Sequence, residues 1–308
     1  MKKTLLITAA VIVGLGLLAA GTVGYIVFGT NTKNKTEVTI HIPRHTDYLQ
    51  LLDSLHKHDI LRSEETFDMV AHYMKYKTVK VGNYTIKPKM SNFELVRMLR
   101  KGQHYPVKFA FNNVRTLPQF IERASKVLFF DTRELAAVMY DSGFWEQYGL
   151  NIASCPQIFI PNSYEFYYDI TPEEFVDKFY KIHQQFWNET RRKQAEEIGL
   201  TPLEVSTLAS IVEEAKFRPQ EKAIIAGLYI NRLHKNMLLQ SDPTVKFALR
   251  DFSRKRILNA DLKVDSPYNT YKYKGLPPGP IRFPEASTLD SVLHYTHHNY
   301  LYMCAKED

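Results

Sequence analysis

The chain has 308 residues, of which 44 % are hydrophobic and 24 % charged, so it is long enough for one or two globular domains with a true core. Its net charge of +7 fits an acidic polymer, anionic lipid headgroups or nucleic acid. The basic residues are scattered, however, and neither a zinc-finger spacing nor a glycine-rich phosphate loop occurs, which argues against a dedicated nucleic-acid protein.

The first residues predict a membrane anchor. "MKK" is followed by an uncharged run from Thr4 to Phe28, and at ~1.5 Å per residue a helix of this length crosses a ~30 Å hydrocarbon core. The run continues past the small residues that a cleavage site needs, so we expect an uncleaved single-pass anchor spanning residues 1–30. Lys2 and Lys3 then stay in the cytoplasm, and the bulk of the chain lies on the periplasmic or extracellular side of the cytoplasmic (inner) membrane.

Residues 37–105 read as a small module that follows a polar linker at 29–37. Alternating "VTIHIP" and "VGNYTIKP" predict strands, and helical spacing separates them. The third helix begins at a capping box formed by Ser91 and Glu94. The resulting β-α-α-β-α order predicts a compact unit, but its composition alone assigns no function.

The rest of the chain completes an α+β class. We expect a connecting α+β region over 106–200 and a last region over 201–308. The last region opens with a helix that is capped by Thr201, and an irregular stretch at 266–284 is rich in Pro, Gly, Tyr and Asn. An irregular, aromatic and amide-rich loop beside helices is suited to bind a polymer.

A helical wheel through "LASIVEEA" separates its two carboxylates from the neighbouring alanine. At ~100° per residue, position 215 falls inside the apolar face, whereas Glu213 and Glu214 lie on its flanks. We therefore expect both glutamates to face solvent. A carboxyl group at 215 would be desolvated, and its raised pKa would suit a general acid near neutral pH. The chain has Ala215 there.

Several ordered segments resemble the endolytic murein transglycosylase (MltG, YceG-like) family. They are "LASIVEE", "GLYINRL", "LLQSDPTVKFAL", "SPYNTYKYKGLPPGPI" and "NYLYMCA", the last of which looks like a strand. The likeness extends to the anchor, to "FIPNSYEFY" and to the first module, which resembles the family's LysM-like subdomain. It implies a membrane-anchored lyase that cuts peptidoglycan glycan strands internally and leaves 1,6-anhydro-muramyl ends.

The resemblance also implies a mechanism with a single acid. That acid protonates the glycosidic oxygen and then, as a base, activates the C6 hydroxyl of the same muramyl sugar, which closes on C1. Ordinary glycosidases instead need two carboxylates. A second carboxylate is not obvious in this chain, although Asp242 in "QSDPT" is a candidate. No metal or other cofactor is expected.

The family motif has the form S-I-V-E-x-E, and its second glutamate is the acid. Carried onto this chain, the first glutamate is Glu213 and the second falls at Ala215. Three explanations stay open: a deliberately inactivated variant, a natural relative that has lost activity, or a chain in which Glu213 or Glu214 serves instead. Family members usually continue beyond the position of Asp308, so we also expect the catalytic region to be truncated at its C-terminus.

Other motif positions are expected to line the glycan groove, where amides and hydroxyls bond sugar hydroxyls and aromatic rings stack. They are Asn231, Gln240, Ser241, Asp242, Thr244, Tyr268, Asn269, Thr270 and Tyr271. A capping role for Asp242 and a turn-forming role for Asn269 are the structural alternatives.

We expect little or no turnover from the chain as written. The alternative function is a non-catalytic peptidoglycan-binding scaffold for cell-wall synthases, and a hydrolase that makes reducing ends is a third possibility. The expected partners are glycan strands, cell-wall synthases and the membrane. The two cysteines, Cys155 and Cys304, either pair in an oxidising compartment or stay separate buried thiols.

Overall fold

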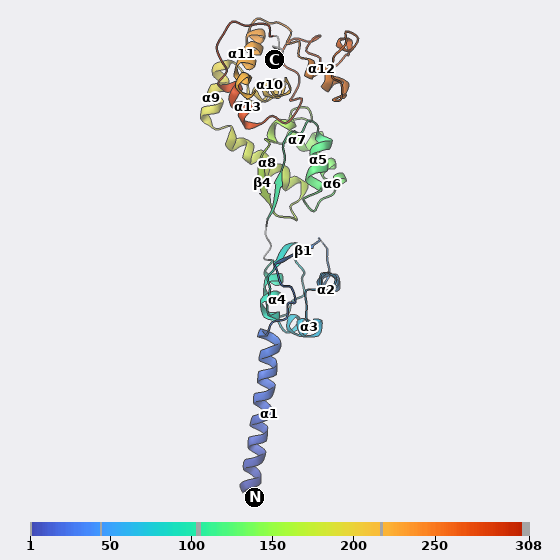
Figure 1. Ribbon diagram of the computed structural model, residues 1–308, viewed down its shortest axis with the longest axis vertical. Helices are drawn as coiled ribbons and strands as arrows, with labels where there is room; N and C mark the ends of the chain where they lie inside the picture. Colours follow the sequence, from blue (N-terminus) through green and yellow to red (C-terminus); the bar gives the residue numbers. More distant parts are fainter. Residues whose placement is uncertain (1, 44, 103–105, 216–217, 304–308) are drawn as a thin grey trace. The chain divides into compact units, whose positions relative to one another are not determined.

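The computed structural model describes residues 2–43, 45–102, 106–215 and 218–303. The chain divides into two compact units, and helices and short strands are mixed in the chain, which confirms the α+β class (Figure 1). The first unit comprises residues 1–107 and 165–169, and the second comprises 108–164 and 170–308.

The first unit is a small α/β module that follows a long helix. Its elements are α1 (Lys2–Phe28), β1 (Val38–Ile42), α2 (Tyr48–Lys57), α3 (Glu64–Tyr73), β2 (Gly82–Ile86) and α4 (Asn92–Lys101). The strands pair antiparallel with Ile40 opposite Tyr84, and both side chains are fully buried. The predicted capping box of Ser91 and Glu94 starts α4, because both of its hydrogen bonds close within one turn of the chain.

Helix α1 is long and apolar enough to cross a membrane, and its stretch Val11–Phe28 is unburied in this unit. Its last turn is part of the module, since Ile26 and Val27 pack against the module core and Asn92 donates a hydrogen bond to the Ile26 carbonyl. The expected polar linker at 29–37 is therefore wrong at its start. Asn31 is buried there and bonds to Ser63 and Asn92.

The second unit is mainly helical. With the strands that lead into and out of it, its elements are β3 (Val107–Ala110), α5 (Leu117–Ser125), α6 (Thr132–Met139), α7 (Ser142–Glu146), η1 (Cys155–Ile158), β4 (Ser163–Phe166), α8 (Pro172–Phe186), α9 (Glu189–Ile198), α10 (Pro202–Glu214), η2 (Pro219–Glu221), α11 (Lys222–His234), α12 (Asp242–Leu249), η3 (Asp261–Lys263) and α13 (Ala286–Leu293). Strand β3 pairs with β4 in a second two-stranded sheet.

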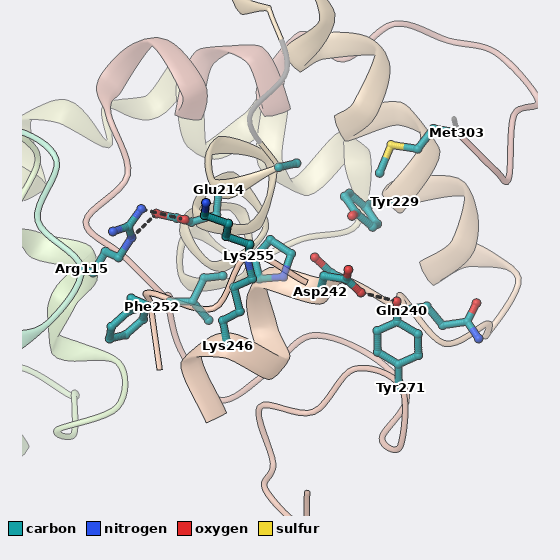
Figure 2. Close-up of a pocket in the computed structure, with 14 residues that line it drawn as sticks. Arg115, Glu214, Tyr229, Gln240, Asp242, Lys246, Phe252, Lys255, Tyr271 and Met303 are labelled. Carbon is teal, nitrogen blue, oxygen red and sulfur yellow. Dashed lines mark hydrogen bonds and ion pairs between the residues drawn. The ribbon is translucent and has the colours of Figure 1, made fainter. Parts of the chain in front are cut away.

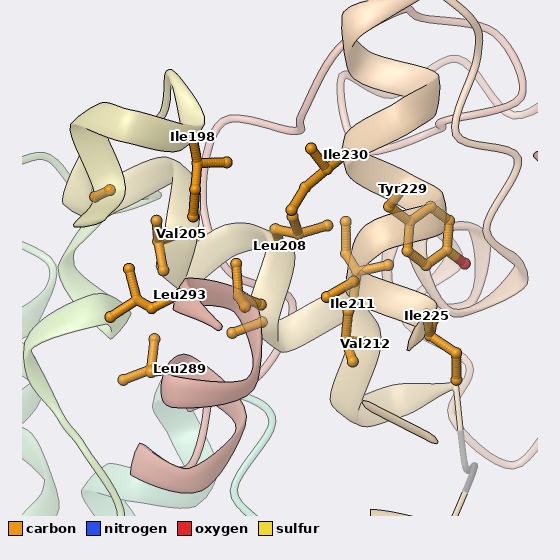
Figure 3. Close-up of a cluster of buried hydrophobic side chains, with 14 of the residues drawn as sticks. Ile198, Val205, Leu208, Ile211, Val212, Ile225, Tyr229, Ile230, Leu289 and Leu293 are labelled. Carbon is orange, nitrogen blue, oxygen red and sulfur yellow. The ribbon is translucent and has the colours of Figure 1, made fainter. Parts of the chain in front are cut away.

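Helix α10 lies at the centre of the aliphatic core of this unit. Val205, Leu208, Ile211 and Val212 are all buried among α9, α11 and α13, as Figure 3 shows. Every residue from Val205 to Val212 is buried. A helix that is covered all round is held in place by its neighbours on each side, so the end of α10 presents its last residues in a fixed position.

The end of the described chain departs from the sequence-based expectation. The segment 299–303 forms no strand and runs as an extended loop beside α11. Cys155 is a buried thiol whose pKa is raised by burial. Its expected alternative partner, Cys304, lies outside the described residues.

Candidate active site

The C-terminal end of α10 opens onto a cavity of about 440 Å³ (Figure 2). The helix starts at the predicted capping box of Thr201 and Glu204 and ends at Glu214, where Ala215 becomes its C-cap. The cavity is lined by Arg115, Glu214, Ala215, Tyr229, Gln240, Ser241, Asp242, Pro243, Lys246, Phe252, Lys255, Tyr271, Ile281 and Met303. Ala215 is thus part of the cavity wall.

Glu214 lines the same wall, but its carboxylate is held by two arginines. Arg115 binds it in a bidentate manner, with Nε–Oε1 at 2.7 Å and Nη2–Oε2 at 3.2 Å. Arg282 adds a third hydrogen bond at 2.8 Å to Oε1. The Glu214 side chain is only 12 % exposed. Charge-assisted, bidentate contacts of this kind are the strong class of hydrogen bond, so this carboxylate is occupied in ion pairs.

Glu213 points away from the cavity into the protein. Its carboxylate accepts a hydrogen bond from the Glu285 backbone N–H at 2.8 Å and pairs with Arg282 at 3.0 Å. Burial raises the pKa of Glu213, and the charge of Arg282 opposes this rise. Glu213 is therefore the glutamate whose surroundings favour a bound proton, and its carboxyl group lies outside the cavity.

The expectation that both glutamates face solvent is wrong. The wheel considered only the apolar residues of α10 itself, whereas the covering groups come from elsewhere in the chain. Arg115 precedes α5, and Arg282 precedes α13. Ala215, the C-cap of α10, keeps right-handed helical backbone angles and is one of the residues that line the cavity.

The opposite wall is built around the turn that starts α12. Gln240 adopts a left-handed conformation with φ of 51°, and its backbone N–H bonds to the Thr270 carbonyl at 3.0 Å. The Ser241 N–H bonds to the Thr270 hydroxyl at 3.0 Å. Asp242 is exposed and accepts a hydrogen bond of 2.6 Å from the Tyr271 hydroxyl (Figure 2). Gln240, Ser241, Asp242 and Tyr271 thus lie together in one wall of the cavity.

Three other motif positions support this wall from behind. Thr244 and Thr270 share a buried hydrogen bond of 2.8 Å between their hydroxyls. Asn269 is fully buried and donates to the carbonyls of Leu262 and Val264. These side chains shape the loop and do not line the cavity, so the turn-forming role fits Asn269.

The remaining two motif residues lie elsewhere. Asn231, near the end of α11, donates to the carbonyls of His298 and Tyr300 and so holds the C-terminal segment. Tyr268 packs on Phe247, with ring centroids 4.7 Å apart, and lines a neighbouring cavity. Neither side chain belongs to the cavity that contains Ala215.

The structure adds cavity residues that the sequence motifs did not single out. They are Arg115, Tyr229, Pro243, Lys246, Phe252, Lys255, Ile281 and Met303. Five of them fall inside segments quoted above, which are the signal that could have found them: Tyr229 in "GLYINRL", Pro243 and Lys246 in "LLQSDPTVKFAL", Ile281 in "SPYNTYKYKGLPPGPI" and Met303 in "NYLYMCA". Arg115 pairs with a residue 99 positions away, and no local pattern encodes such a contact.

The composition of the walls suits a polyhydroxylated ligand. Amide and hydroxyl groups, three cations and aromatic rings face one space, while Glu214 is neutralised by its arginines. Burial is the main cause that raises the pKa of both Tyr229 and Tyr271, so both phenols are neutral hydrogen-bonding groups at neutral pH. Within the described residues, no group of His, Cys, Asp and Glu side chains is placed to hold a metal ion.

Comparison with known proteins gives consistent results. A family model described as YceG-like matches residues 40–308. An endolytic murein transglycosylase of Bacillus subtilis is 28 % identical over 89 % of this chain and 80 % of its own length. An endolytic murein transglycosylase of Streptococcus pneumoniae is 26 % identical over 96 % of this chain, which spans 60 % of that relative.

A solved structure shares the fold. The crystal structure of a yceG-like protein from Listeria monocytogenes superposes with a TM-score of 0.57 at 26 % identity, covering 88 % of this chain and 94 % of that one. The family match takes in both compact units and the whole cavity wall. The chain therefore belongs to the YceG-like family.

Proposed function

We propose that this chain binds murein glycan strands in the cavity at the end of α10 and that, as written, it does not cleave them. The observation that carries the proposal is that Ala215 lines the cavity, at the position where the resemblance to the family motif puts the acid. The names of the relatives from Bacillus subtilis and Streptococcus pneumoniae support an endolytic murein transglycosylase as the parent activity.

The parent reaction requires one proton donor and a glycan strand that is bound beside it. A carboxylic acid at 215 would protonate the glycosidic oxygen, and the resulting carboxylate would take the proton of the C6 hydroxyl as it closes on C1 of the muramyl sugar. No water is consumed, and the product carries a 1,6-anhydro ring. In this chain the remaining residues, including Gln240, Asp242 and Tyr271, can still hold the strand.

Neither neighbouring glutamate replaces the acid in this proposal. Glu214 would have to leave three hydrogen bonds with Arg115 and Arg282 before it could carry a transferable proton. Glu213 has a raised pKa but faces Arg282 and the Glu285 backbone instead of the cavity. A catalytic acid must reach the oxygen that it protonates, and this geometry comes before pKa.

The test is Ala215→Glu in the full chain, incubated with purified peptidoglycan. We expect products with 1,6-anhydro-muramyl ends from this variant, at a rate at least about 100-fold above the chain as written, which is the usual contribution of a general acid. Ala215→Gln is the matched control, because it adds the same volume without a proton donor. Equal product formation by the chain as written and by Ala215→Glu would refute the placement of the acid.

The alternative is a non-catalytic scaffold that binds peptidoglycan for cell-wall synthases, and Ala215 itself favours it. Ala215→Glu then restores no cleavage while the chain still retains glycan strands in a sedimentation assay. Products with reducing ends and no anhydro ring would instead identify a hydrolase.

We further propose that helix α1 anchors the chain in the cytoplasmic (inner) membrane, with both compact units on the periplasmic or extracellular side. The apolar stretch Val11–Phe28 supports the span, and a murein substrate supports the orientation, because glycan strands lie outside that membrane. In this proposal residues 37–105 act as a LysM-like glycan-binding module next to the membrane, within reach of cell-wall synthases.

A further inference from the structure

A second cavity of about 530 Å³ lies beside the first and shares Arg115 and Phe252 with it. Its lining is Arg115, Thr116, Leu117, Pro118, Tyr140, Ile152, Ala153, Pro156, Phe247, Arg250, Phe252, Tyr268 and Pro280. Because Arg115 and Phe252 line both, the two cavities are adjacent, at the distance between a sugar and a substituent that it carries.

The second cavity differs from the first in its chemistry. Its walls are mostly carbon, with the rings of Tyr140, Phe252 and Tyr268 and the aliphatic groups of Leu117 and Ile152. Apart from its two arginines, it offers few hydrogen-bonding side chains. A sugar ring carries hydroxyl groups all round and would leave many of them unpaired here, so these walls fit a ligand with methyl groups better.

The charged side chains that line this cavity are both positive. Arg115 and Arg250 are its only charged residues, and Arg115 is already neutralised by Glu214. Within the described chain, Arg250 forms no ion pair, and its guanidinium lies 4.1 Å from the Phe247 ring centroid. Arg250, Tyr140 and Tyr268 line the same cavity, and the positive charge of Arg250 opposes the rise that burial causes in the pKa of both phenols. Arg250 is exposed at this cavity, so its positive charge is available to an anionic group of a ligand.

The backbone of Arg250 is also unusual. It is the C-cap of α12 and has a left-handed φ of 56°. Glycine or asparagine normally takes this position, because a Cβ atom makes the conformation costly. Arginine therefore occupies a position at which glycine would have less backbone strain.

We propose that this second cavity binds the peptide stem of a murein strand whose glycan lies in the first cavity, and that Arg250 pairs with a stem carboxylate. Murein is a glycan that carries short peptides on its muramyl sugars, and these peptides combine methyl groups with carboxylates, which matches both the walls and the charge. The inference rests on the proposed glycan-binding function and adds a recognition element to it. The chain would then distinguish peptide-bearing strands from bare ones.

The experiment compares two soluble, end-labelled murein strands, one with intact peptide stems and one stripped of them by an amidase. Binding to the full chain in detergent micelles is followed by fluorescence anisotropy, and Ala215 keeps the strands uncut. We expect the peptide-bearing strand to bind about five-fold more tightly, which is the effect of one partly exposed ion pair. Arg250→Gly should abolish this preference and leave the affinity for the stripped strand unchanged.

The control variant is Lys75→Gly. Lys75 is exposed, lies in the first unit and also has a left-handed φ, of 54°, so the variant loses the same charge and relieves the same strain. It should keep the preference for peptide-bearing strands. Arg250→Gly should melt at a temperature no lower than the parent chain, because glycine adopts positive φ without strain, and this excludes unfolding as the cause of the loss.

Two results would overturn the inference while the proposed function stands: equal affinity of the parent chain for both strands, or a preference that survives in Arg250→Gly. If neither strand binds, the proposed function itself fails, and the peptide subsite fails with it.

Discussion

Two adjacent glutamates at the end of α10 have different surroundings. Glu214 faces the cavity and is neutralised by two guanidinium groups, whereas Glu213 is turned inward onto Arg282 and a backbone N–H. The side chain of Arg282 is only 8 % exposed and pairs with both carboxylates. Arg282 is therefore the group that allows two acids to stay side by side in a mostly buried place.

Replacing Arg282 should therefore destabilise the fold strongly. Arg282→Leu removes a cationic partner from both carboxylates. Breaking a buried ion pair in this way lowers the free energy of unfolding by about 3–5 kcal/mol. Lys181→Leu on α8 is the control, since Lys181 is 69 % exposed in its pair with Asp177 and such pairs contribute at most about 1 kcal/mol. Urea unfolding measures both, and equal losses would contradict the proposed role of Arg282.

Glu213 should make stability depend on pH. Its pKa in the fold lies above the ordinary value of 4.5, because burial outweighs the attraction of Arg282. Between these two values the folded state binds more protons than the unfolded state, so the contribution of Glu213 to stability falls as pH rises through this window. Glu213→Gln should lack this fall, and urea unfolding from acid to neutral pH measures the difference.

The opposite sign is expected at an exposed site. The pKa of Glu122 is lowered by its hydrogen bond to Lys126, so the contribution of this residue is lost as pH falls. Glu122→Gln should therefore change the pH profile in the reverse direction. A pH profile that is the same in Glu213→Gln and in the parent chain would argue against a buried, proton-binding Glu213.

At the scale of elements, α11 and the C-terminal segment fit together through a glycine. A Cβ atom at Gly227 would lie 2.4 Å from the Thr296 carbonyl oxygen and 3.0 Å from the His298 ring. Farther along α11, Asn231 and Arg232 bond to carbonyls of the same segment. The close approach brings Met303 into the cavity wall.

Gly227→Ala should consequently destabilise the protein, although Ala favours helices over Gly by about 1 kcal/mol at open positions. The clash with a backbone atom forces a shift, and overpacking of this kind costs about 1–3 kcal/mol. Thermal unfolding measures the loss of stability. Limited proteolysis should cleave the segment on the C-terminal side of His294 earlier than in the parent chain. Unchanged or higher stability would mean that the C-terminal segment is not held against α11 in this way.

At the scale of the whole molecule, helix α1 and the first module form one folded unit. Ile26 and Val27 are partly buried against the module core, and Asn92 donates a hydrogen bond to the last turn of α1. The apolar stretch that precedes them is exposed in the described chain. The proposed span and the module are thus joined by a packed contact, so the module sits directly at the end of the helix.

Two N-terminal truncations separate the proposed membrane attachment by α1 from its packing against the first module. A chain that begins at Val23 should leave the membrane fraction and keep the melting temperature of the first module, because it retains Ile26 and Val27. A chain that begins at Thr30 should also be released but should melt at a lower temperature, since it loses this apolar burial and the partner of Asn92. Sedimentation and thermal unfolding measure both variants, and identical melting would contradict the packed contact.

Local sequence was sufficient for the features that close within one turn of the chain. The capping boxes at Ser91 and Thr201 form as their spacing predicts, because donor and acceptor are three residues apart and no distant group decides the outcome. The sequence also showed the long apolar run at the N-terminus. Of the nine residues expected to line a groove, Gln240, Ser241, Asp242 and Tyr271 line one cavity. The family motif predicts that the acid position falls at Ala215, which lines a cavity in the structure; its catalytic meaning stays a prediction.

Tertiary structure alone decided the surroundings of those residues. Arg115 and Arg282 reach Glu214 from 99 and 68 positions away, and their arrival buries both glutamates that the helical wheel left in solvent. Tyr268, Asn269 and Thr270 are neighbours in sequence, yet they are divided between a second cavity and the support of a loop. The physical reason is that burial and ion pairing depend on which distant elements pack together, and no window of local sequence contains that information.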